Sequence, residues 1–425
     1  MGHGGQRLSW GRKGANVPDR RRSGSGRSAG AVRPDAAVRG MQPERHAPRP
    51  PRPRAVRVKG NKAVPIALAL TVAILGCGAA GATHLAMQAQ EEEPLVQAYE
   101  NAPEPAEEGL DMAEASVPQH ADDVTMTLNG DADTILLAGE EYLEAGCHAV
   151  QAGVGDITDS IKVTGDVDAS TPGDYTVTYQ ATTADGSYAD ATRTVHVVDD
   201  LDAADDLPVL MYHYVYTAMD PPDELDGNYL LDTDFEQQLQ YLSSNDFYYP
   251  SYQEVRAFVD GTHTLPAKSI VLTFDDGEQG FLDYGVPLLN EYEVPATSFL
   301  ICDDGDAAYK AEAYASEYVR FQSHSFGMHK AGSSVGQGGI LHAMSQQEIY
   351  EDAMEAQAVL GDVEALAYPF GDNSETAWAA LEEAGILCAF TVKNDRISPG
   401  ENPYALDRVR ISGEYTLDGF KSLVS

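Results

Sequence analysis

The sequence predicts an α/β domain at the C-terminal end of the chain, an all-β sandwich before it and a single transmembrane helix near the N-terminus. Three observations lead to this prediction. From residue 207 onward, short apolar runs alternate with helical stretches. Residues 124–198 instead alternate polar and apolar side chains with a period of two. Residues 63–82 are 20 consecutive uncharged positions, about the length needed to cross a hydrocarbon core.

Charge divides the chain at this apolar segment. Residues 1–62 contain 16 Lys and Arg against 3 Asp and Glu, a net charge of +13, whereas the remaining residues contain 12 against 64, a net charge of −52. Arg, Gly, Pro and Ser dominate residues 1–62, and such a composition cannot bury enough apolar surface to fold. We therefore expect a disordered basic cytoplasmic segment at 1–62 and an acidic body that does not act on nucleic acid.

We expect residues 63–87 to form a transmembrane signal anchor in a bacterial cell membrane. Basic residues precede the apolar run and acidic residues follow it, so the positive-inside rule places the N-terminus in the cytoplasm and the body outside the cell. A cleaved signal peptide is the main alternative, and Cys77 leaves lipidation open. Residues 88–121 are acidic and contain several prolines, which indicates an extended linker.

The region from 122 to 200 is predicted to be the all-β sandwich. Its alternating segments are separated by turn dipeptides such as Asn129-Gly130 and Asp185-Gly186. The stretches at 139–142 and 170–177 resemble the bacterial immunoglobulin-like (Ig-like) modules of surface proteins. Those modules act as stalks or wall-contact units, and no residue of this region marks a catalytic site.

Residues 207–425 are predicted to form one α/β domain. Strands are expected at 208–215, 269–274, 296–301, 365–368 and 387–392, with helices beginning near 233 and 251 and others at 284–292, 346–360 and 375–384. Strands separated by helices indicate a mainly parallel sheet, either a barrel or an open sheet. Enzymes of this class keep their chemistry at the C-terminal ends of the strands.

Two carboxylates stand at the end of one predicted strand. Asp275 and Asp276 directly follow an apolar run, although an ordinary solvated turn has the same composition. Neighbouring side chains on a strand point to opposite faces, so we expect the two carboxylates to have different roles. Farther along the chain, His324 and His329 supply two imidazoles. Imidazole combined with carboxylate is a donor set that zinc selects, and Asp276, His324 and His329 leave one coordination position for water.

A stiff turn follows the strand expected at 365–368. Its sequence, Tyr368-Pro369-Phe370-Gly371, presents backbone N–H groups that are suited to holding an oxyanion.

These motifs make residues 207–425 resemble the polysaccharide deacetylase (NodB-homology) family of carbohydrate esterases. The motifs are Thr273-Phe274-Asp275-Asp276-Gly277, His324-Ser325 with His329, and Tyr368-Pro369. The resemblance implies an irregular (β/α) barrel that binds a divalent metal, most often Zn²⁺. It also implies the role of each residue, which is general base for Asp275, metal ligand for Asp276, His324 and His329, and oxyanion donor for the Tyr368 backbone N–H. The position of His329 is similar to that in the branch that de-N-acetylates poly-N-acetylglucosamine.

The chain departs from the family pattern at two positions. No histidine follows His342, so the general acid that the family places near its C-terminus is missing. We expect His213, in the strand at 208–215, to replace it, with a packed strand histidine as the alternative. The family also orients its base with an arginine that is missing before Tyr368. Arg408 or Arg410 is expected to supply that function, with a solvated charge at the edge of the strand as the alternative.

The sequence therefore predicts a membrane-anchored extracellular hydrolase that removes N-acetyl groups from a cell-envelope polysaccharide containing N-acetylglucosamine. The expected substrates are peptidoglycan or poly-N-acetylglucosamine. A catalytically degenerate glycan-binding protein and an O-acetyl polysaccharide esterase are the alternatives. No pattern in the sequence indicates the oligomeric state.

Overall fold

The computed structural model describes residues 118–425. The predicted basic segment, the transmembrane anchor and all but the end of the linker lie outside these residues. Within residues 118–425, no helix combines the length and the apolar character needed to cross a membrane.

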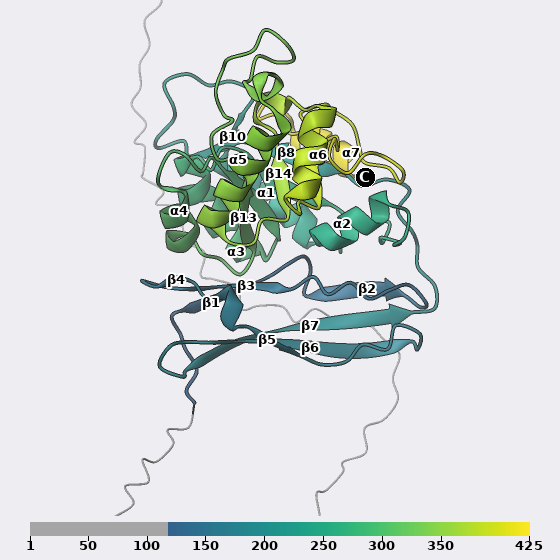
Figure 1. The fold of residues 1–425 in the computed structure, drawn as a ribbon. Coiled ribbons are helices and arrows are strands. Elements are labelled where there is room, and N and C mark those ends of the chain that lie inside the picture. The colour runs from purple at the N-terminus through teal and green to yellow at the C-terminus, as the bar shows by residue number, and fades with distance from the viewer. Residues whose placement is uncertain (1–117) are drawn as a thin grey trace, which may run out of the picture. The chain divides into compact units, whose positions relative to one another are not determined.

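Residues 122–200 form two β-sheets that enclose a small core (Figure 1). One sheet contains β1 (Val124–Leu128), β3 (Cys147–Gln151) and β4 (Gly155–Asp156). The other has the order β2-β7-β6-β5, with bounds Asp133–Leu137, Tyr188–Val198, Gly173–Thr182 and Lys162–Thr164. Strand β2 is parallel to β7, whereas β6 is antiparallel to both of its neighbours. The all-β sandwich predicted from the alternating pattern is confirmed.

A seven-stranded parallel sheet forms the centre of the C-terminal domain, in the order β15-β14-β13-β12-β11-β8-β16. In chain order these strands are β8 (Val209–Tyr212), β11 (Val271–Phe274), β12 (Ala296–Leu300), β13 (Val319–Ser323), β14 (Ala365–Ala367), β15 (Cys388–Phe390) and β16 (Val409–Arg410). A bridge between Phe390 and Leu406 links β15 to the segment that leads into β16. The sheet is therefore a curled, incompletely closed version of the predicted barrel.

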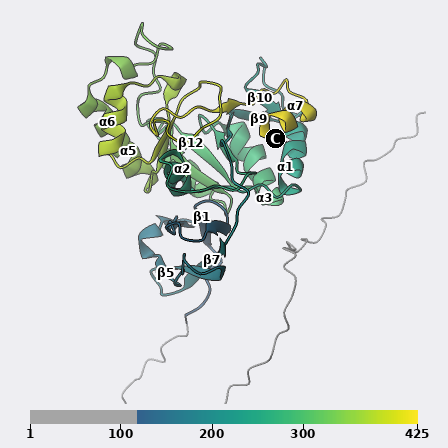
Figure 2. The same ribbon diagram turned by 90° about the vertical axis from the view of Figure 1, so that its right-hand side faces the viewer.

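Helices pack around the sheet. They are α1 (Asp232–Ser243), α2 (Tyr252–Val259), α3 (Val286–Tyr292), α4 (Ala307–Ala313), α5 (Gln346–Leu360), α6 (Glu375–Glu383) and α7 (Leu417–Val424). Figure 2 shows α5 and α6 on one side of β12 and α1, α3 and α7 on the other. Helices α2 and α5 begin with capping boxes, in which Ser251 pairs with Glu254 and Ser345 with Glu348.

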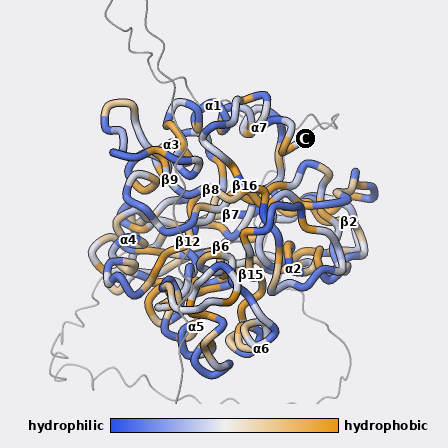
Figure 3. Tube along the Cα trace, turned by 90° about the horizontal axis from the view of Figure 1, so that it is seen from above, coloured by the Kyte–Doolittle hydropathy of each residue, from blue (hydrophilic) through white to orange (hydrophobic). Residues whose placement is uncertain are grey.

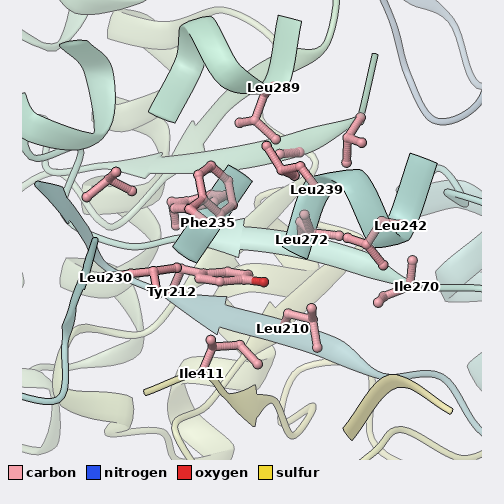
Figure 4. Packing of buried hydrophobic residues seen from close by; sticks show 14 of the residues in the cluster. Leu210, Tyr212, Leu230, Phe235, Leu239, Leu242, Ile270, Leu272, Leu289 and Ile411 are labelled. Carbon is pink, nitrogen blue, oxygen red and sulfur yellow. The ribbon is translucent and has the colours of Figure 1, made fainter. Parts of the chain in front are cut away.

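The largest core lies between the sheet and helices α1 and α3. Leu210 and Leu272 of the sheet pack with Phe235 and Leu239 of α1 and Leu289 of α3 (Figure 4). Figure 3 shows the same organisation for the whole domain, with hydrophobic segments in the central strands and hydrophilic segments in the surrounding loops. This packing fixes the ends of β8 and β11, where the candidate site begins.

The first predicted strand of the domain, 208–215, is divided in two at His213. Strand β8 ends at Tyr212, and β9 (Tyr214–Tyr216) pairs with β10 (Tyr229–Leu231) in a separate two-stranded ribbon. Because Tyr212 of β8 is in register with Phe274 of β11, the residues that follow them lie side by side at the same edge of the sheet. Those residues are His213 and Asp275.

Candidate active site

The two adjacent carboxylates lie in different environments because the strand ends before them. Strand β11 stops at Phe274, and Asp276 has a φ of 72°, in the left-handed region. The next residue favours glycine, because Gly277 has a φ of 60° and a Cβ there would also lie 2.2 Å from Cδ2 of the buried Leu300. Asp275 is 2% exposed, whereas Asp276 is partly exposed. The predicted difference in environment is present, but a tight turn produces it rather than strand alternation.

Asp276, His324 and His329 converge on one point. Oδ1 of Asp276 lies 3.3 Å from Nε2 of His324 and 3.5 Å from Nε2 of His329. One ligand atom from each residue lies within 4.8 Å of the others. Nδ1 of His324 is 2.8 Å from the Ala367 carbonyl, an interaction that places the proton on Nδ1 and leaves Nε2 available. The donor set and its spacing therefore fit a divalent metal with imidazole and carboxylate ligands.

Two side chains outside the motifs hold this cluster through hydrogen bonds. The Tyr214 hydroxyl donates to Oδ2 of Asp276 at 2.7 Å. The Asp352 carboxylate accepts from the backbone N–H of Phe326 at 2.8 Å and of Gly327 at 2.7 Å, within the loop that carries both histidines. Sequence reasoning missed both residues. The sequence did contain one indication for Asp352, because it is an acidic residue on the otherwise apolar face of α5. In the structure, Asp352 is 7% exposed.

Asp275 is held by a buried arginine. Two guanidinium nitrogens of Arg408 each donate to a carboxylate oxygen of Asp275 at 2.7 Å, and Arg408 is fully buried. Although burial alone would raise the pKa of Asp275, the charge and hydrogen bonds of Arg408 hold that pKa below its usual value. Arg410 is exposed and donates to Asn228 instead. Of the two arginines expected as the orienting group, Arg408 is the one that contacts Asp275.

His213 lies beside both carboxylates without belonging to the cluster of Asp276, His324 and His329. Burial lowers the pKa of His213 below its usual value, and the negative charges of Asp275 and Asp276 act in the opposite direction. His213 directly follows Tyr212 at the end of β8, and the expected base Asp275 directly follows Phe274 at the end of the neighbouring strand β11.

The structure corrects the role expected for Tyr368. Its backbone N–H donates to the Phe390 carbonyl at 3.0 Å as part of the pairing between β14 and β15, so this group is not free to hold an oxyanion. Its side chain is fully buried, and its hydroxyl donates to the Tyr404 carbonyl. Pro369 has no N–H, so the next backbone donor along the turn belongs to Phe370. The Phe370 ring stacks on His329 with centroids 5.0 Å apart, which places this residue beside the cluster of Asp276, His324 and His329.

Comparison with family models identifies two regions of the chain. Residues 126–197 match the bacterial surface protein Ig-like domain, and residues 262–389 match polysaccharide deacetylase. Both matches lie inside the regions that the sequence analysis assigned to these families. The resemblance proposed from the motifs is thus confirmed.

Curated relatives agree with this assignment. The poly-β-1,6-N-acetyl-D-glucosamine N-deacetylase of Staphylococcus epidermidis is 25% identical over 217 residues, which cover 47% of this chain and 73% of that protein. The enzyme of the same name from Staphylococcus aureus strain MRSA252 is 24% identical over 206 residues, 45% of this chain and 69% of that protein. Among solved structures, the Streptococcus pyogenes deacetylase PplD in complex with acetate has 22% identity and a TM-score of 0.44, with coverage of 52% of this chain and 98% of that one.

Proposed function

The chain joins a polysaccharide deacetylase domain to a bacterial surface Ig-like domain, and from this premise we propose that it is a metal-dependent enzyme that removes N-acetyl groups from a cell-envelope polysaccharide. Poly-β-1,6-N-acetylglucosamine is the proposed substrate, because relatives that carry that activity in their names align with this chain over about half its length. The observation that carries the proposal is the cluster of Asp276, His324 and His329 beside the buried, arginine-bound Asp275.

The cluster is proposed to hold one divalent metal, with zinc as the first choice for this donor set. A metal bound there supplies a Lewis acid that activates water and polarises a carbonyl group. Tyr214 and the Ala367 carbonyl orient two of the three ligands through hydrogen bonds, which fixes their geometry before substrate arrives.

Asp275 is proposed to be the general base. Its lowered pKa keeps it ionised near neutral pH, and the two hydrogen bonds from Arg408 fix the plane of its carboxylate. An ionised, oriented carboxylate can accept the proton of the attacking water. Arg408 acts through Asp275 and is a positioning residue.

His213 is proposed to be the general acid that protonates the departing amine. It lies one strand away from Asp275, at the same edge of the sheet. The imidazolium form is needed for this step. Burial lowers the pKa of His213, and the negative charges of Asp275 and Asp276 limit that lowering. The Phe370 backbone N–H replaces that of Tyr368 as the proposed oxyanion donor, because Phe370 lies on the turn that packs against His329.

The cellular setting is part of the proposal. Residues 63–87 are proposed to anchor the chain in the membrane with its N-terminus in the cytoplasm, so that the Ig-like and deacetylase domains face the envelope. The acidic body suits an extracellular glycan that becomes cationic as its amines are released.

Acetate release by the full chain tests the proposed function. The substrates are β-1,6-linked N-acetylglucosamine oligomers, peptidoglycan and acetyl-xylan, each with and without a chelator. We expect release from the oligomers that stops with chelator and returns with added zinc. Asp276→Ala should abolish both activity and metal retention, whereas Asp418→Ala, at an exposed acid of α7, should change neither. Release from acetyl-xylan alone would refute N-deacetylation.

A further inference from the structure

The ribbon of β9 and β10 has one buried face and one aromatic face. Val215 and Leu230 are 2% and 3% exposed and belong to the main core. Because side chains alternate along a strand, Tyr214, Tyr216 and Tyr229 lie together on the opposite face. Parallel pairing places Tyr214 directly beside Tyr229. We call this face, made of Tyr214, Tyr216 and Tyr229, the tyrosine ledge.

The three rings of the tyrosine ledge contact one another. The Tyr214 and Tyr229 centroids are 4.8 Å apart, and those of Tyr216 and Tyr229 are 6.4 Å apart. All three side chains are partly exposed. None of them belongs to, or packs against, a hydrophobic core cluster within residues 118–425. Core packing therefore does not explain why this face is aromatic.

The tyrosine ledge is continuous with the candidate active site. The Tyr214 hydroxyl donates to Asp276, a proposed metal ligand, at 2.7 Å. Tyr229 and then Tyr216 extend the aromatic surface away from that contact. A polymer with one unit at the metal cluster would thus place a neighbouring unit on these rings.

We propose that the tyrosine ledge is a sugar-binding subsite for the unit next to the one being deacetylated. The proposal rests on the proposed function, because it takes the occupant to be the same glycan. An aromatic ring offers a flat apolar face and, in tyrosine, a polar hydroxyl at its edge. A pyranose ring matches both features, since it has apolar C–H faces and hydroxyl groups at its periphery. Tyr229 is central to the subsite because it contacts both other rings.

The test compares substrates that do and do not reach the tyrosine ledge. Kinetics of the full chain would be measured on a β-1,6-linked N-acetylglucosamine pentamer and on a small chromogenic acetyl ester that occupies only the metal centre. We expect Tyr229→Ala to raise KM for the pentamer by roughly 10-fold, with kcat and hydrolysis of the small ester unchanged. Tyr229→Phe should keep the KM of the wild type. Tyr309→Ala, at a 69% exposed tyrosine of α4, is the matched control and should change nothing.

Binding separates this proposal from the proposed function. Affinity for the pentamer would also be measured with the chelator-treated full chain, in which no turnover occurs, and Tyr229→Ala should weaken it by a similar factor. An unchanged KM and an unchanged affinity in Tyr229→Ala would overturn the subsite. Absence of acetate release by the wild type from every glycan would refute the proposed function instead, and the binding measurement would still decide the subsite.

Discussion

Replacing Arg408 should damage stability and activity together, because this side chain is the buried partner of the proposed base. Arg408 is fully buried, and it donates to both oxygens of Asp275, to the Thr391 carbonyl and to the Thr273 hydroxyl. Arg408→Met removes the positive charge and leaves Asp275, 2% exposed, as a buried carboxylate without its partner. Breaking a buried pair in this way costs about 3 to 5 kcal/mol of unfolding free energy.

A double variant isolates the pair from the loss of packing. Arg408→Met combined with Asp275→Ala removes both charges, so the remaining loss should be about 1 to 2 kcal/mol, from the cavity and the lost hydrogen bonds. The single variant is thus expected to be less stable than the double variant. Arg410→Met, two residues along at an exposed position, should stay within about 0.5 kcal/mol of the wild type.

Urea unfolding of the full chain, followed by circular dichroism and by the fluorescence of Trp378 in α6, measures these differences. Acetate release measured on the same variants should fall by at least about 100-fold in Arg408→Met and stay unchanged in Arg410→Met. A loss of less than 1 kcal/mol in Arg408→Met, or a double variant less stable than the single one, would refute the interpretation of Arg408 as the partner of a buried ionised Asp275.

Further predictions address three other residues, His213, Asp352 and Tyr368. His213→Ala should lower kcat by about 100-fold or more without changing metal content; equal loss of metal would remove the general-acid role. Asp352→Asn should weaken metal binding by about 10-fold in chelator competition, with Glu355→Gln on the same helix as the unaffected control. Burial raises the pKa of Asp352 from 3.8 to about 6, so its contribution to stability is complete below pH 3.8 and is lost as pH rises through about 6. Relative to Asp352→Asn, the unfolding free energy of the wild type should therefore fall by about 3 kcal/mol across that range, and a rise would contradict the assignment. Tyr368→Phe should keep its activity, because only the hydrogen bond to the Tyr404 carbonyl is lost; an activity loss in a stably folded variant would restore a catalytic role.

The parts of the site that depend on local sequence were predictable. An apolar run that ends in Asp275 and Asp276 gives both the strand and the carboxylates at its end, and His324 and His329 lie in one short loop. The difference in environment between the two carboxylates was also expected from this pattern, although the backbone turn at Asp276 that produces it was not visible there.

The parts that depend on tertiary contacts were not predictable. Arg408 and Arg410 lie two residues apart, and only the tertiary structure shows that Arg408 contacts Asp275 whereas Arg410 contacts Asn228. The Tyr368 N–H was assigned wrongly because it donates to the Phe390 carbonyl of β15, and the local sequence does not show which strand pairs with 365–368. Asp352 lies on α5 and accepts a hydrogen bond from the loop that carries His324 and His329. No regular spacing in the sequence indicates such a contact between distant segments.

The central claim is that the site of Asp275 and Asp276 cleaves an N-acetyl group from a glycan. Mass spectrometry of a β-1,6-linked N-acetylglucosamine oligomer, incubated with the zinc-loaded full chain, tests it most directly. The claim predicts stepwise loss of whole acetyl groups, with new free amines, and no such loss with Asp275→Asn at equal metal content. An oligomer of unchanged mass, or equal deacetylation by the Asp275→Asn variant, would contradict it.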